Sequence, residues 1–170
     1  LRLVNALLSE DGEYVEEYAR NWTTLWTNVL IGRAGGTQDG SLLHLVDGRW
    51  ELIGHAGAPI QALQYLADTI WVGTDAGLTL VQGNKQRQLA PLEGVKVFAI
   101  LATPTNVWVG AADGLWQVSP AFSTAVSYTG QNDLPPGAVT AIAQDEAGAL
   151  WVGIGNTIVQ LRPDEHFVEV

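Results

Sequence analysis

The residues of this chain that could do acid–base or metal chemistry are three histidines and a set of carboxylates. His44, His55 and His166 lie far apart, and none pairs with another at the spacing of a zinc site. Asp-Gly pairs recur, but without the dense alternation of acidic residues that a calcium loop needs, so we interpret them as turns. No G-x-S-x-G, P-loop or H-E-x-x-H motif is present. We therefore predict no metal site and no cofactor, and we assign no catalytic residue.

Composition restricts the partners. The 170 residues include 8 Lys and Arg against 18 Asp and Glu, for a formal net charge of −10. Nucleic acids and anionic membrane surfaces need clustered basic residues, so neither is an expected partner. The longest apolar run, residues 97–102, is too short for a membrane span, so no direct membrane insertion is expected. The chain lacks methionine and begins at Leu1, which suggests that it was processed or belongs to a longer chain.

A Trp-Val-Gly triplet organises the sequence. It occurs at residues 71–73, 108–110 and 151–153, and a weaker copy, Leu-Ile-Gly, lies at 30–32. Recurrence at intervals of roughly 40 residues, within strand-like segments, is typical of a β-propeller. The pattern therefore predicts an all-β fold built from repeated sheets.

The last repeat defines the expected unit. Residues 138–143 read as an innermost strand, 150–153 as a second, 157–162 as a third and 166–170 as a fourth, with tight turns between them. Four such antiparallel strands make one propeller blade. We predict about four blades over residues 29–170, at 29–57, 58–93, 94–136 and 137–170. In the first, a Gly-rich loop is expected at 33–40. The blades form a closed ring, part of a larger ring, or a partial propeller completed by another chain or oligomer.

Residues 1–28 fit this scheme less well. Tyr14, Tyr18, Trp22 and Trp26 recur every four residues, which is a helical stripe. We predict a short helical or irregular segment here, with a helix over about residues 12–22. The alternative is a first blade strand over 22–26, preceded by an acidic loop.

A family resemblance follows from the fourth unit. Its segment 132–142, Asn-Asp-Leu-Pro-Pro-Gly-Ala-Val-Thr-Ala-Ile, continues through Asp145 and Gly148 to the triplet at 151–153, and it resembles the two-component regulator propeller repeat. The later half of that repeat is also matched by Thr74, Gly77 and Leu78, and by Gly114 and Leu115. The resemblance implies propeller blades of the kind usually found in extracytoplasmic sensor regions of bacterial signalling proteins. It implies a location in the periplasm or at the cell surface. The absence of cysteine is compatible with such a location and equally with the cytoplasm.

The triplets supply the predicted structural core. Strand alternation puts Trp and Gly on one face, where a large ring beside a glycine suits packing between neighbouring blades. The residues assigned to this core are Trp71, Gly73, Trp108, Gly110, Trp151 and Gly153.

Candidate binding residues come from the loops. In a propeller, the loops between blades and the hairpins between second and third strands share one face, and function concentrates on loops held by a rigid scaffold. Trp116 falls outside the triplets and is a candidate contact aromatic. The full set of candidates for ligand or partner binding is Arg33, His55, Asp75, Glu93, Asp113, Asp133 and Trp116.

These features favour a non-catalytic propeller that senses a ligand or binds a protein. The expected partner is a protein or a small molecule such as a carbohydrate. One alternative is a structural subunit or fragment of a larger assembly. Another is a propeller enzyme, a lyase or hydrolase, acting at the central mouth.

Overall fold

The computed structural model describes residues 27–31, 34–47, 49–66, 69–83, 85–128, 134–162 and 166–170. These residues form four antiparallel sheets of four strands, each in chain order. The first sheet contains β1 (Thr27–Ile31), β2 (Ala34–Thr37), β3 (Ser41–Val46) and β4 (Arg49–His55). The second contains β5 (Ile60–Leu66), β6 (Thr69–Thr74), β7 (Gly77–Gln82) and β8 (Lys85–Gln88), and is followed by the 3-10 turn η2 (Ala90–Leu92).

The remaining two sheets repeat this order. The third contains β9 (Val97–Ala102), β10 (Val107–Ala111), β11 (Gly114–Val118) and β12 (Ala125–Ser127). The fourth contains β13 (Val139–Gln144), β14 (Leu150–Ile154), β15 (Thr157–Leu161) and β16 (Phe167–Glu169). The all-β architecture of four four-stranded blades predicted from the repeats is confirmed. The helix predicted over residues 12–22 lies outside the described residues.

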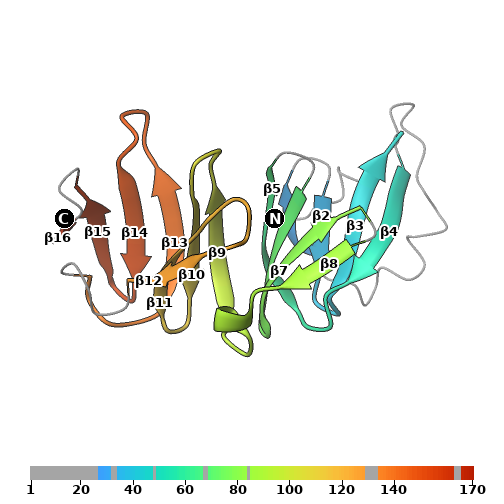
Figure 1. The fold of residues 1–170 in the computed structure, drawn as a ribbon, viewed down its shortest axis with the longest axis horizontal. Coiled ribbons are helices and arrows are strands. Elements are labelled where there is room, and N and C mark those ends of the chain that lie inside the picture. The colour runs from blue at the N-terminus through green and yellow to red at the C-terminus, as the bar shows by residue number, and fades with distance from the viewer. Residues whose placement is uncertain are drawn as a thin grey trace.

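The four described sheets form an open fan. The innermost strands contact one another in succession, β1 with β5, β5 with β9 and β9 with β13. Figure 1 shows the outermost strands β4 and β16 at opposite ends of the molecule, with the innermost strands between them. A closed four-bladed ring would instead bring the first and fourth sheets side by side.

The hydrophobic core lies between successive sheets. In the second sheet β6 is buried at all positions but the first, and in the third sheet β10 is buried throughout. These strands are covered on both sides, which explains why they read as continuous apolar runs. In contrast, four of the six residues of β13 are exposed. Among the described residues, therefore, none covers one face of the fourth sheet.

A glycine contact recurs at each junction between sheets. A β-carbon placed on Gly73 would lie 2.5 Å from Cγ1 of Val97, the first residue of the next innermost strand. The corresponding distance is 2.4 Å from Gly36 to Cγ2 of Ile60. Only glycine lets a strand approach its neighbour this closely.

This contact corrects the alignment of the first repeat. Gly36 pairs with Leu42 as Gly73 pairs with Leu78, so residues 34–36 occupy the triplet position. The weaker copy proposed at 30–32 is wrong, because residues 30 and 31 belong to the innermost strand β1. The Gly-rich segment predicted as a loop at 33–40 contains strand β2.

Candidate ligand-binding loop face

Backbone hydrogen bonds gather the loops at one end of the sheets. The N–H of Asp75 donates to the carbonyl of Pro59 at 3.2 Å, and the N–H of Ala112 donates to that of Lys96 at 2.8 Å. Each bond ties a hairpin between second and third strands to the loop that enters the same sheet. We call this end the loop face, comprising residues 38–40, 55–59, 75–76, 89–96 and 112–113. Its side chains are held by the scaffold at one edge of the fan.

Asp75 is the best-connected carboxylate of the loop face. Its Oδ1 lies 2.8 Å from Nζ of Lys96 and accepts a hydrogen bond of 2.9 Å from Nε2 of Gln61. The side chains of Asp75 and Lys96 are 37% and 38% exposed, so the ion pair is open to solvent. It connects the hairpin of the second sheet to the loop that enters the third. Lys96 also lies over the ring of Phe98, 5.4 Å from its centroid.

A second polar group lies at the first sheet. Asp39 is exposed in the β2–β3 hairpin and accepts hydrogen bonds from the hydroxyls of Thr37 and Ser41. The Thr37 hydroxyl is the largest influence holding the pKa of Asp39 below its ordinary value of 3.8, and nearby His55 contributes. His55 is itself exposed at the end of β4, where its Nδ1 accepts a hydrogen bond from the N–H of Gly57.

The third sheet contributes an aromatic residue. Nε1 of Trp116 donates to Oδ1 of Asp113 at 3.0 Å, which places the indole edge beside the β10–β11 hairpin. Trp116 is half-buried, while Asp113 is exposed. Glu93 is exposed directly after η2.

The structure thus brings His55, Asp75, Glu93 and Asp113 to one face, with Trp116 at its edge, whereas Arg33 and Asp133 lie outside the described residues. Sequence reasoning missed Asp39, Gln61 and Lys96. Lys96 carried a signal, because it lies at the start of the third predicted blade, 94–136. The roles of Gln61 and Asp39 depend on side-chain partners that a linear pattern does not reveal.

The described residues contain no group of three or more histidine, cysteine, aspartate or glutamate side chains that could hold a metal ion. Within the same part of the chain, no helix has the length and apolar character needed to cross a membrane.

The triplet tryptophans occupy two environments. Trp71 is 1% exposed and meets the ring of Phe122 edge-on, with 5.4 Å between centroids. Trp108 is 7% exposed and lies 5.5 Å from the ring of Tyr128. Trp151 is only half-buried, and its Nε1 donates to Oδ2 of Asp145 at 2.9 Å. The difference follows from position, since the first two face a following sheet, whereas Trp151 faces no other described sheet.

The fourth sheet identifies the repeat. Residues 133–162 match the family model described as Two component regulator propeller. The resemblance to this family is confirmed. No curated protein matches the sequence.

Solved structures agree on the fold. The chain is similar to the extracellular domain assigned to the hybrid two component system BT4673 from B. thetaiotaomicron, with a TM-score of 0.73 and 16% identity over 85% of this chain and 21% of that one. The corresponding domain of BT3049 from the same organism gives a TM-score of 0.73 and 20% identity, over 85% of this chain and 22% of that one. The GH74 enzyme of Niastella koreensis gives a TM-score of 0.63 and 13% identity, over 80% of this chain and 27% of that one. This chain therefore spans between 21% and 27% of the length of each of these three proteins.

Proposed function

We propose that this chain is a non-catalytic segment of a sensor propeller that binds a ligand or protein partner at its loop face. The observation that carries the proposal is the tying of interblade loops to hairpins, which holds polar side chains from three sheets at one edge. Rigid presentation lowers the entropy that a binding loop loses on complex formation. Lys96 pairs with only one of the carboxylates of this face, Asp75, so a cationic or neutral polar partner suits it. The four carboxylates are Asp39, Asp75, Glu93 and Asp113.

The proposal includes an extracytoplasmic location. It is supported by the match of the fourth sheet to a two-component regulator repeat and by likeness to extracellular domains. Shared fold alone does not fix function, so the location is tested directly. We expect a reporter fused to the full-length protein to be accessible to protease added outside intact cells.

The loop face is tested by titrating the ¹⁵N-labelled chain with Lys- and Arg-rich peptides and with neutral oligosaccharides. We expect amide shifts confined to residues 55–58, 75–76, 93–96 and 112–113. The variant Asp75→Asn should weaken the response, while Glu146→Gln, at the opposite end of the fourth sheet, should not. Shifts centred on the turns at 103–106 and 145–149 would contradict the proposal. Release of new reducing sugar ends from the oligosaccharides would favour the alternative of a propeller enzyme.

We further propose that another blade of the same repeat type covers the fourth sheet. Ile158 is 54% exposed, and Ala141 and Ala143 are exposed as well. A β-carbon on Gly153 would meet only Ala141 of its own sheet, with its nearest atom at 3.3 Å. The position therefore has room for the innermost strand of a following blade.

An extended chain tests this completion. A copy of residues 95–133, whose innermost strand begins at Val97, is joined after Val170. We expect acrylamide quenching of Trp151 fluorescence to fall and the unfolding midpoint to rise. The matched control carries Gly153→Leu in the same extended chain, where the added side chain would block the approach of the new strand. Equal quenching of Trp151 in the original and extended chains would contradict the completion.

A further inference from the structure

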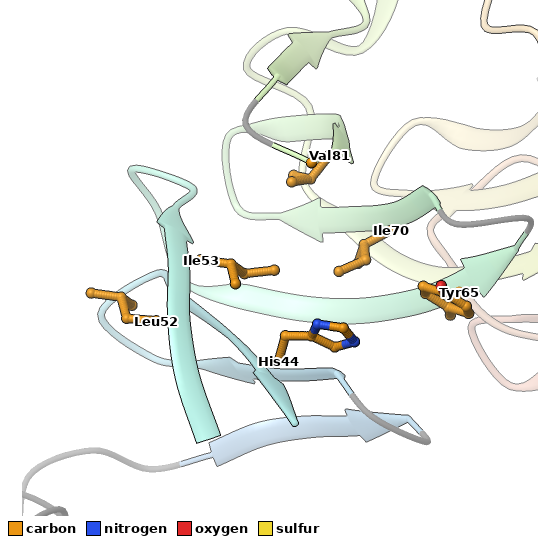
Figure 2. Close-up of a pocket in the computed structure, with 7 residues that line it drawn as sticks. His44, Leu52, Ile53, Tyr65, Ile70 and Val81 are labelled. Atoms are coloured by element: carbon orange, nitrogen blue, oxygen red, sulfur yellow. The ribbon is translucent and has the colours of Figure 1, made fainter. Parts of the chain in front are cut away.

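A pocket of about 330 Å³ lies between the first and second sheets. Its described lining includes His44 and Ile53 from the first sheet and Tyr65, Ile70 and Val81 from the second. Figure 2 shows Ile53 and Ile70 pointing toward each other, with the His44 ring below them. The volume falls at the lower end of the range for small-molecule sites.

The next junction shows what normally fills this position. Between the second and third sheets, Trp71 belongs to one core cluster with Val107 and Val118, and Ala102 packs against that cluster. Val107 is the residue that pairs with both Val118 and Ala102 across the third sheet. Trp71 and this group of three paired residues thus belong to the same packed core at the second junction.

The pocket is lined by the register equivalents of that group. Ile70 pairs with Val81 and with Tyr65 in the second sheet, just as Val107 pairs with its two partners in the third. His44 in turn occupies the position of Leu80, because it pairs with Ala34 as Leu80 pairs with Trp71. The pocket therefore lies where the repeat places a tryptophan side chain.

The first repeat lacks that tryptophan. Residue 34 holds the register position of Trp71 and is alanine, so the indole present at the next two junctions has no counterpart in the sequence here. Trp108 fills the same position at the third junction, in a cluster with Leu150. Within the described residues, two junctions filled by an indole and one with a pocket in the same place form an internal comparison. Each filled position accepts an indole ring with an exposure of 7% or less.

We propose that this pocket binds an uncharged planar aromatic ligand of about the size of indole. Its walls supply the aliphatic contacts of Ile53, Ile70 and Val81, and the rings of His44 and Tyr65 offer edge or stacked contacts to an aromatic ligand. The site lies within a sheet junction, apart from the loop face. It stands or falls independently of the function proposed above.

The experiment uses indole as the probe with methyl-labelled protein. We expect intermolecular NOEs from indole to the methyl groups of Ile53, Ile70 and Val81, and none to Ile100 or Ile142 at the other junctions. Saturable binding with this pattern supports the site. Absence of binding at the solubility limit of indole, or NOEs centred on another junction, would overturn it.

Variants give a second readout. Ala34→Trp supplies the missing side chain, and we expect it to abolish indole binding and raise the thermal unfolding midpoint. Ala147→Trp, the same substitution in the exposed β13–β14 turn, should retain wild-type affinity. Val81→Phe narrows the pocket and should also weaken indole binding. It replaces Ala34→Trp in the test if that variant does not fold. Unchanged affinity in a folded variant of either kind would also overturn the site.

Discussion

Gly110 and Val139 meet at the junction of the third and fourth sheets so closely that no side chain fits between them. A β-carbon on Gly110 would lie 2.7 Å from both Cγ1 and the carbonyl oxygen of Val139. The carbonyl is backbone and cannot rotate away. The same contact joins Gly73 to Val97 and Gly36 to Ile60. A glycine at this position of the repeat therefore determines how closely successive sheets approach.

Replacing glycine at this position should destabilise the protein more where another sheet covers the glycine than where none of the described sheets does. We expect Gly110→Ala to lower the free energy of unfolding by about 1–3 kcal/mol, the usual range for overpacking a core. Gly153→Ala should lower it by clearly less, because Gly153 is half-buried and the added β-carbon would lie 3.3 Å from its nearest neighbour, Cβ of Ala141. Urea denaturation followed by circular dichroism measures both. Similar losses in the two variants would mean that Gly153 is as confined as Gly110.

The tryptophans should differ in the same way. Trp71→Ala removes a ring that is 1% exposed, and a loss of about 3–5 kcal/mol is expected for a buried Trp. Trp151→Ala removes a half-buried ring on the uncovered sheet, so its cost should be clearly smaller. Denaturation midpoints of the two variants give the comparison. A greater loss for Trp151→Ala would contradict the open position of the fourth sheet.

The repeat pattern predicted the sheets well because it records packing that each unit shares. A strand covered on both faces is mostly apolar, and this shows directly in residues 70–73 of β6 and in all five residues of β10. The first unit was misaligned because alanine stands at residue 34, where the other units have tryptophan. Without that marker, Leu30 and Ile31 of the innermost strand resembled the triplet more closely.

Asp145 makes the stability of the fold depend on pH in the acid range. The Trp151 indole N–H, followed by the backbone N–H of Ala149, holds the pKa of Asp145 below its ordinary value of 3.8. A carboxyl whose pKa is lower in the folded state stabilises the fold above its unfolded pKa, and this contribution is lost as pH falls through the folded value. We expect wild type to be more stable than Asp145→Asn near neutral pH, and the difference to shrink below about pH 4.

Denaturation midpoints at several pH values test this dependence. Glu146→Gln is the control, because it removes a neighbouring charge from the same exposed turn without removing an acceptor for Trp151. A separate check follows the indole N–H resonance of Trp151, which should shift as Asp145 protonates. A stability difference that is constant across the acid range would show that the hydrogen bond does not favour the ionised carboxylate.

The loop face was only partly predictable from sequence. Asp75 and Asp113 could be placed because turn chemistry marks the hairpins in which they lie. The ion pair of Asp75 with Lys96 could not be predicted, because Lys96 is distant in sequence and meets Asp75 only when the second and third sheets pack together. The environment of Trp151 was equally hidden, because its burial depends on a following sheet and not on the local motif.

The ion pair between Asp75 and Lys96 should be weak and sensitive to salt. Both side chains are more than a third exposed, so a coupling energy under about 1 kcal/mol is expected. A double-mutant cycle with Asp75→Asn and Lys96→Met measures it, and methionine keeps an apolar stem beside Phe98. Because solvent ions screen exposed charges, the coupling should fall between low salt and about 1 M NaCl. A coupling that persists in high salt would indicate that the hydrogen bonds around Asp75, and not its charge, hold this part of the loop face together.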